Sequence, residues 1–217
     1  MHHFLNVGLY DGLFVMQDVE TETLWSHITG EALYGKMLDH QMPISNLLQM
    51  NVALALEMDP DMPVAISDYV GGRVGPDMGP GNEQAQLRAE FSQTLGREDT
   101  RRERMEVGLG LWSDTARKYY PFSTLREAGR VIIDEFDGRR LVVYVDPLSA
   151  TPAAAFVDAA EAQIEGREVV FNDGRRIRAG QLIDRDEKAS ALDRPNQIFT
   201  RWYGYSLTFP EADIYGE

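Results

Sequence analysis

The sequence contains no cysteine among its 217 residues. This absence excludes disulfide bonds, thiolate metal sites and a cysteine nucleophile. It also leaves the redox state of the protein's compartment undetermined. Any catalytic or metal-binding chemistry therefore has to come from oxygen and nitrogen groups or from methionine thioethers.

Positive charge is scarce. The chain has 21 basic against 35 acidic residues, which gives a formal net charge of -14. Such a charge repels phosphate backbones, so we expect no nucleic-acid partner. The densest basic stretch, residues 97–104, is interleaved with Glu98, Asp99 and Glu103, a pattern typical of a solvated helix face.

Long hydrophobic runs are also missing. No apolar stretch approaches the ~20 residues of a membrane helix, and residues 1–11 lack the charged-then-apolar order of a signal peptide. We therefore expect a soluble protein without membrane insertion, cytoplasmic by default. An export signal would require sequence beyond that given.

The composition is that of a folded protein, with 43% hydrophobic and 10% aromatic residues. Alternating apolar residues interrupted by turn residues predict hairpins at 5–16, at 131–145 through Asp137-Gly138, and at 168–178. The expected fold class is α+β and β-rich, with antiparallel hairpins and a few flanking helices.

Three helices are expected from apolar residues at helical spacing. The first covers residues 44–58, with Ser45 as its N-cap and Pro60 just beyond its end. A short helix covers residues 123–128. An exposed helix within residues 82–104 is indicated by Leu87, Phe91 and Leu95.

A glycine- and proline-rich stretch at residues 71–81 divides the chain. We expect an N-terminal part at residues 1–70, a linker with an exposed helix at 71–105, and a β-rich C-terminal part at 106–217. Residues 43–66 and 195–215 also run in a similar order from proline through an amphipathic stretch to proline and acid. This echo is compatible with the end of one repeat followed by most of a second, or with chance.

The stretch around Trp25 holds the first candidate site. If the chain turns at Thr29-Gly30, then Trp25, His27 and Glu31 meet as an aromatic wall, an imidazole and a carboxylate, which can bind a ligand or relay a proton. The alternative is that Trp25 packs in the core with His27 as its satisfied partner.

A second candidate site follows an apolar strand. Tyr144, Asp146, Ser149 and Thr151 stand where loop side chains commonly meet a ligand, with Asp146 as a second candidate acid. Asp-Pro at positions 146–147 is equally typical of a type I turn, in which these residues have only a structural role.

The amino terminus offers a copper hypothesis. A free amine followed by His2 and His3 supplies, with deprotonated amides, a square-planar nitrogen set that suits Cu(II). Five methionines add thioethers that suit Cu(I), but Met is also a common core filler: Met37, Met42, Met50, Met58 and Met62. An accidental terminus and core methionines are the alternative.

Several motifs together resemble a known family. Residues 24–32 read Leu-Trp-Ser-His-Ile-Thr-Gly-Glu-Ala, residues 120–122 read Tyr-Pro-Phe, residues 133–135 read Ile-Asp-Glu, and residues 143–151 read Val-Tyr-Val-Asp-Pro-Leu-Ser-Ala-Thr. They resemble motifs of the bacterial and archaeal domain-of-unknown-function 3179 family (DUF3179). The family has no settled activity, so the resemblance implies a family but no reaction.

Two departures from the family pattern matter. The Trp-Ser motif precedes the Pro-Leu motif here and follows it in the family, which favours a truncated or tandem arrangement. The positions that resemble the family's Cys pair hold Asp146 and Ser149, so a thiol role is not available.

From these observations we expect a non-catalytic ligand-binding or structural module with an unidentified small ligand. Its aromatic segment at residues 199–209 forms either a core edge or an interface between copies of the chain. One alternative is an enzyme that acts on a small polar substrate through His27 with Glu31 or Asp146. The other is the copper protein described above.

Overall fold

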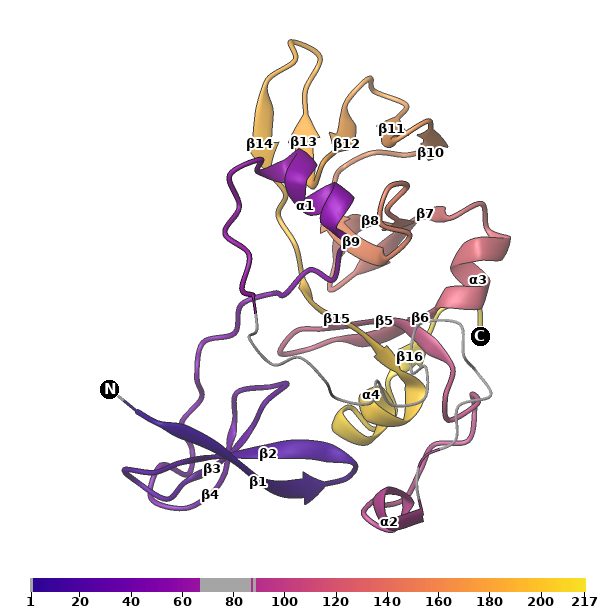
Figure 1. Cartoon of the computed structure of the whole chain (residues 1–217). Helices are drawn as coiled ribbons and strands as arrows, with labels where there is room; N and C mark the ends of the chain where they lie inside the picture. Colours follow the sequence, from indigo (N-terminus) through magenta and orange to yellow (C-terminus); the bar gives the residue numbers. More distant parts are fainter. Residues whose placement is uncertain (1, 67–86, 88) are drawn as a thin grey trace.

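The computed structural model describes residues 2–66, 87 and 89–217, which fold into four β-sheets with four short helices (Figure 1). Strand pairing is antiparallel apart from one parallel pair near the C-terminus. The β-rich α+β class and its hairpins are confirmed. None of the helices in these residues is long and apolar enough to span a membrane.

The N-terminal sheet is a four-stranded meander. Its strands pair in the order β1 (Phe4–Tyr10), β2 (Leu13–Asp18), β3 (Leu24–Ser26) and β4 (Ala32–Tyr34). Asp11 and Gly12 join the first two strands with φ of 50° and 70°, as a tight hairpin turn requires. The hairpin predicted at residues 5–16 is therefore confirmed.

The central sheet is built from strands distant in the sequence. Its order is β15 (Asn196–Arg201), β5 (Val107–Trp112), β6 (Arg117–Pro121) and β16 (Asp213–Ile214), with β16 parallel to β6. Helix α3 (Phe122–Glu127) follows β6 and confirms the short helix predicted there, and helix α4 (Trp202–Thr208) follows β15.

The remaining two sheets are meanders. The third sheet comprises β7 (Val131–Phe136), β8 (Arg139–Val145) and β9 (Pro152–Phe156). The fourth comprises β10 (Ala162–Glu165), β11 (Glu168–Phe171), β12 (Arg176–Arg178), β13 (Gln181–Ile183) and β14 (Ala189–Ala191). Both hairpins that the sequence predicts in this half are present.

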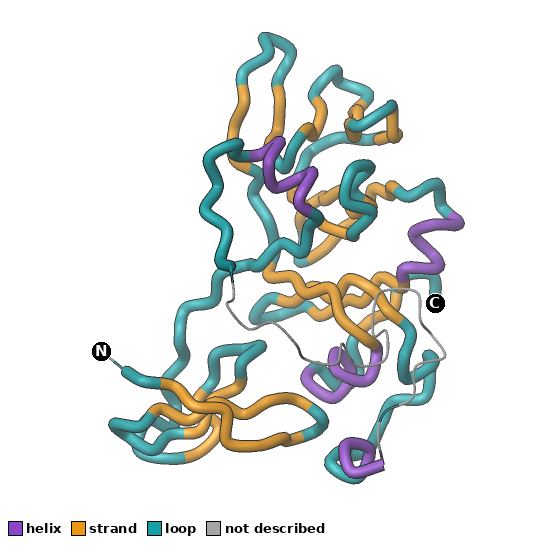
Figure 2. The backbone as a smooth tube through the Cα atoms, viewed as in Figure 1, coloured by secondary structure: helices purple, strands orange, loops and turns teal. Residues whose placement is uncertain are grey.

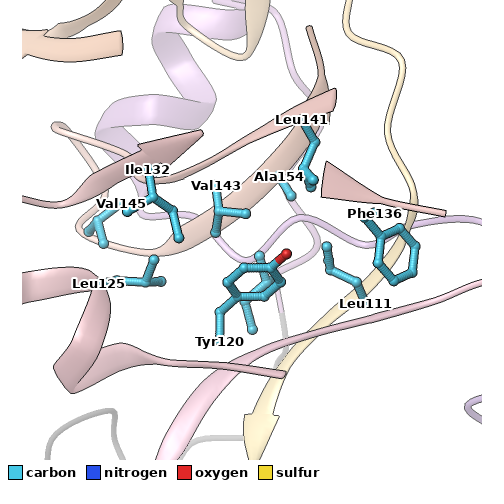
Figure 3. Close-up of a cluster of buried hydrophobic side chains, with 10 residues drawn as sticks. Leu111, Tyr120, Leu125, Ile132, Phe136, Leu141, Val143, Val145 and Ala154 are labelled. Atoms are coloured by element: carbon cyan, nitrogen blue, oxygen red, sulfur yellow. The ribbon is translucent and has the colours of Figure 1, made fainter. Parts of the chain in front are cut away.

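The central and third sheets pack over the main hydrophobic core (Figure 3). Leu111 and Tyr120 come from the central sheet, Leu125 from α3, and Leu141 and Val143 from β8. All five side chains have 1% or less of their surface exposed. This core therefore fixes the two sheets against each other.

The second cluster uses the other face of β8. Alternate strand residues point to opposite faces. Val142 and Tyr144 accordingly pack with Val169 and Ile177 of the fourth sheet. Because both of its faces are buried, β8 can carry the unbroken apolar run Leu-Val-Val-Tyr-Val.

Helix α4 and the residue after it place Trp202, Tyr205 and Phe209 of the aromatic segment 199–209 in a third cluster beside the N-terminal sheet. Trp202 and Tyr205 are fully buried, and Phe209 is 5% exposed. They pack with Tyr119 of β6, whose ring centroid lies 5.0 Å from that of Trp202. These three rings therefore belong to the core, and an interface between copies through residues 199–209 stays a prediction.

Strand β5 has a glycine at alternate positions. Its leucines, Leu109 and Leu111, join the main core on one face. Gly108 and Gly110 lie on the opposite face, where the rings of Tyr119 and Tyr205 contact the bare backbone. The missing side chains thus make room for the aromatic cluster.

The helix predicted at residues 44–58 is wrong in its first half. Helix α1 spans only Val52–Met58. Its N-cap is Asn51 and not Ser45, because the Asn51 side chain accepts a hydrogen bond of 2.9 Å from the Leu54 amide. The predicted end before Pro60 is correct.

Residues 43–50 form an arm without regular secondary structure (Figure 2). The Asn46 side chain donates to the Pro195 carbonyl at 2.8 Å and accepts from the Gln197 amide at 2.9 Å. Gln49 donates to a carbonyl of β15 at 3.3 Å. These contacts with a distant strand hold the arm out of a helix.

Residues 82–86 and 88 of the exposed helix predicted within 82–104 lie outside the described residues, and the described part contains one turn, α2 (Ala89–Ser92). The basic stretch at residues 97–104 is not a helix face. Its arginines pair locally instead: Arg101 with Asp99 and Arg104 with Glu98, both at 2.6 Å. Such partly exposed pairs neutralise charge but stabilise little.

The linker predicted at residues 71–81 lies outside the described residues. The division into 1–70, 71–105 and 106–217 therefore stays a prediction, as does the repeat. Residues 43–66 and 195–215 do share one structural feature. Each contains a seven-residue helix, α1 or α4, that ends two residues before a proline, Pro60 or Pro210.

The buried tyrosines predict alkaline unfolding. Burial, with Asp134 close by, raises the pKa of Tyr120 well above its ordinary value of 10.0, and burial raises the pKa of Tyr205 in the same direction. A group whose pKa is raised by folding contributes stability below pH 10 that is lost as pH rises toward the folded-state pKa. We expect tyrosinate absorbance and loss of near-ultraviolet circular dichroism to appear together above about pH 10. Complete tyrosine titration with an intact dichroism spectrum would contradict this.

Candidate functional site

A small cavity opens between the β1–β2 hairpin, the turn after β3, and helix α4. Its volume is about 130 Å³. An engineered apolar cavity of ~150 Å³ admits benzene, so this one suits a molecule of similar size. Its lining consists of Tyr10, Asp11, Leu13, Phe14, Val15, Ser26, His27, Thr29, Glu31, Leu33, Leu207 and Thr208.

The turn after β3 positions the polar residues that line the cavity. Gly30 donates its amide to the Ser26 carbonyl at 3.0 Å and has φ of 72°. A Cβ on Gly30 would lie 2.6 Å from the Met42 carbonyl oxygen, so only glycine fits. The Thr29 amide donates to Ser26 Oγ at 3.1 Å. The chain therefore turns at Thr29-Gly30, the condition under which His27 and Glu31 were expected to meet.

His27 is exposed and held by the neighbouring strand. Its Nδ1 lies 2.7 Å from the Phe14 carbonyl oxygen. A carbonyl only accepts hydrogen bonds, so Nδ1 carries the proton in this contact. In the neutral ring, Nε2 then keeps its lone pair and can accept from a ligand or take up a proton.

Glu31 is the carboxylate of the same turn. It is exposed, and it accepts a hydrogen bond of 3.0 Å from the Thr29 hydroxyl. Asp11 of the hairpin turn is the second acidic residue of the lining, and its Oδ1 lies toward Gly96. Lysine and arginine do not occur among the lining residues, so the charged groups of the cavity are acidic.

Trp25 does not line this cavity. It is 5% exposed, and its indole Nε1 donates to Asp18 Oδ2 at 3.0 Å. Its partner is thus a fully buried carboxylate and not His27. His27 and Glu31 thus line the same cavity, whereas Trp25 lies in the interior.

The Asp146 loop forms a turn, the second of its two interpretations. Asp146 Oδ1 accepts hydrogen bonds from the amides of Leu148 and Ser149 at 3.0 and 2.8 Å. Ser149 and Thr151 share a hydroxyl contact of 2.6 Å, and the Thr151 hydroxyl donates to the Gln49 carbonyl. The loop therefore contacts the arm at residues 43–50. It joins two strands of the third sheet, whereas His27 follows a strand of the N-terminal sheet (Figure 1).

Tyr144 lies inside the second hydrophobic cluster. It is 2% exposed, and its hydroxyl accepts a hydrogen bond of 3.2 Å from Arg194. Burial raises the pKa of Tyr144, so the phenol stays protonated. Its surroundings are those of a core residue.

The N-terminal histidines contact the turn between β2 and β3. His2 Nδ1 lies 3.4 Å from Asp18 Oδ1, and His3 Nδ1 lies 2.5 Å from Glu20 Oε1. The His3 amide donates to Glu20 at 3.0 Å, whereas the copper hypothesis requires that amide to be deprotonated. Met1, whose amine would complete the copper site, lies outside the described residues.

Asp11 and Asp18 are not among the site residues predicted from the sequence. Asp11 lies within the hairpin predicted at residues 5–16. Asp18 opens the stretch Asp-Val-Glu-Thr, whose Asp-to-Thr spacing is typical of a side-chain-capped turn, and the Thr21 amide indeed donates to Asp18 at 2.6 Å. That local signal could have marked Asp18 as a turn residue, but not as a buried one.

The family model described as "Protein of unknown function (DUF3179)" matches residues 5–212. The chain belongs to the DUF3179 family. No match was found among curated proteins or among solved structures. In this DUF3179 chain, Asp146 and Ser149 take the positions that resemble the family's Cys pair, and both serve the turn described above.

Proposed function

We propose that this DUF3179 protein is a non-catalytic binding module whose cavity beside His27 takes a small organic cation with an apolar body. The observation that carries the proposal is the composition of the cavity wall. Asp11 and Glu31 are its acidic lining residues, His27 is its one imidazole, and lysine and arginine are absent from the lining. A cation therefore gains favourable interactions there, while an anion meets repulsion.

The rest of the wall supports an apolar body on that cation. Leu13, Phe14, Leu33 and Leu207 line the cavity, and Tyr10 adds an aromatic ring at its edge. Aromatic faces attract organic cations as well as apolar groups. The net charge of -14 also raises the local concentration of cations around the protein.

The rival hypothesis is an enzyme that uses His27 and Glu31 as acid and base in the same cavity. Asp146 does not contribute, because it serves a turn of the third sheet. Among the described contacts, the Nδ1 partner of His27 is a backbone carbonyl and not a carboxylate, and no hydroxyl nucleophile is paired with the ring. Binding therefore accounts for the geometry better than nucleophilic catalysis does.

Three isosteric probes test the proposal: benzylamine, benzyl alcohol and benzoate, titrated into the protein and followed by NMR. We expect benzylamine to bind most tightly and benzoate least. Glu31→Gln should weaken benzylamine binding about two- to five-fold, as loss of an exposed ion pair does, and leave benzyl alcohol unchanged. Equal binding of all three probes, or no binding, would overturn the proposal.

Two further variants sharpen the test. Glu127→Gln makes the same charge change on α3, far from the cavity, and should not alter binding. His27→Asn keeps a donor for the Phe14 carbonyl and removes Nε2. If His27 only binds, this variant weakens probe binding at an unchanged melting temperature; a turnover that it abolishes would favour the enzyme instead.

A further inference from the structure

A second cluster of ionisable groups lies at the other end of β1, where the chain enters the N-terminal sheet. His2 precedes β1, and Asp18 and Glu20 lie at the end of β2 and in the turn that follows. His2 Nδ1 is 3.4 Å from Asp18 Oδ1 and 3.8 Å from Glu20 Oε2. The three donor atoms all lie within 4.8 Å of one another.

The two printed separations from His2 are compatible with ligands that share one cation. Ion-paired nitrogen and oxygen atoms approach to ~2.7–2.9 Å. Ligand atoms on a tetrahedral zinc, each ~2.0–2.1 Å from the metal, stand roughly 3.3–3.4 Å apart. The His2–Asp18 distance equals that spacing, and the His2–Glu20 distance exceeds it by only a few tenths of an ångström.

Asp18 is held in place by groups outside the cluster. Its side chain is fully buried. Trp25 Nε1 and the Thr21 hydroxyl both donate to Oδ2, whereas Oδ1 accepts from the Thr21 amide at 2.6 Å and faces His2. Outer hydrogen bonds of this kind orient the carboxylate ligands of metal sites.

Glu20 is oriented in a similar way by His3. The His3 amide donates to Oε2 at 3.0 Å, and the His3 ring contacts Oε1 at 2.5 Å. These contacts fix the orientation of the Glu20 carboxylate.

We propose that His2, Asp18 and Glu20 form a zinc-type divalent cation site, with one position left for water. One imidazole and two carboxylates are nitrogen and oxygen donors of the kind that zinc accepts. The site would tie His2, two residues ahead of β1, to the end of β2 and the turn that follows. It differs from the copper hypothesis, because it uses neither the terminal amine nor the His3 amide. It is also independent of the cavity at His27.

The test uses the full chain, stripped with a chelator and then titrated with Zn²⁺ alone. We expect one zinc per chain by elemental analysis, and a melting temperature that rises with added zinc. Co²⁺ should give the intense visible absorption of a four-coordinate site. His2→Ala and Glu20→Gln, both at partly exposed positions, should each weaken zinc binding at least ten-fold.

The controls separate this site from others. Glu22→Gln removes an exposed carboxylate from the same turn and should leave zinc affinity unchanged. Asp18→Asn should also weaken zinc binding. Because this change also affects the buried hydrogen bonds of Asp18 and hence folding, the test of the proposal rests on His2→Ala and Glu20→Gln. Zinc binding that is absent, or unchanged in both His2→Ala and Glu20→Gln, overturns the proposal. Metal lost only in His3→Ala assigns it to the amino terminus and likewise overturns it.

Discussion

Replacing Gly110 with alanine is expected to lower the free energy of unfolding by about 3 kcal/mol or more, the upper end of overpacking costs. A Cβ at this position would lie 2.2 Å from two ring carbons of Tyr205. The ring is fully buried, and its hydroxyl donates to the carbonyls of Leu111 and Lys118, so it has no room to withdraw. Urea denaturation followed by circular dichroism measures the loss.

Gly204 provides the matched control. It is also buried, but it lies within α4 and its φ is outside the left-handed region. A Cβ there would meet Leu13 and Thr200 at 3.5 Å, an ordinary contact. Gly204→Ala should therefore be neutral or stabilise by up to ~1 kcal/mol. If Gly110→Ala and Gly204→Ala behaved alike, close contact between β5 and Tyr205 would be excluded.

Replacing Trp202 with alanine is expected to cost about 3–5 kcal/mol of stability, as for other large buried aromatics. The side chain is fully buried and packs edge-on against Tyr119. Its indole Nε1 donates to the Asp99 carbonyl at 2.8 Å, and the Arg101 guanidinium lies 5.6 Å from the ring. The loss therefore removes core volume and releases the preceding loop. For a chain of this size the melting temperature should fall by roughly 6–20 °C.

The comparison variant for Trp202 is Tyr34→Ala, at an aromatic residue that is 72% exposed. Surface substitutions of this kind usually change stability by less than ~0.5 kcal/mol. Trp202→Phe should recover part of the loss, because it restores a ring but not the donor to Asp99. A Trp202→Ala loss no larger than that of Tyr34→Ala would show that α4 is not part of the core.

The hairpins could be predicted because their information is local. Asp137 and Gly138 both adopt positive φ, at 52° and 71°, which Asp-Gly tolerates, and alternating residues on either side set the register. The helix over residues 44–58 was wrong for the opposite reason. Asn46 is held by residues about 150 positions later in the chain, and a periodicity pattern carries no record of such contacts.

The sequence predicts one part of the candidate cavity lining and not the other. His27 and Glu31 stand on one turn, so the turn residues Thr29 and Gly30 sufficed to bring them together. Leu207 comes from a helix at the far end of the sequence, and that contribution follows only from the packing of α4 against the N-terminal sheet. The turn role of Asp146 was open from the sequence because a ligand loop and a type I turn use the same residue types.

The partners of the arm at residues 43–50 are synthesised long after the arm itself. Asn46 leaves the ribosome 149 residues before Pro195, the partner of its side chain. At roughly 5–20 residues per second, that interval lasts about 8–30 s. During it, Ile28 and Ile44 have no aromatic helix to cover them. The N-terminal sheet and the arm can therefore complete their packing only after β15 and α4 have been synthesised.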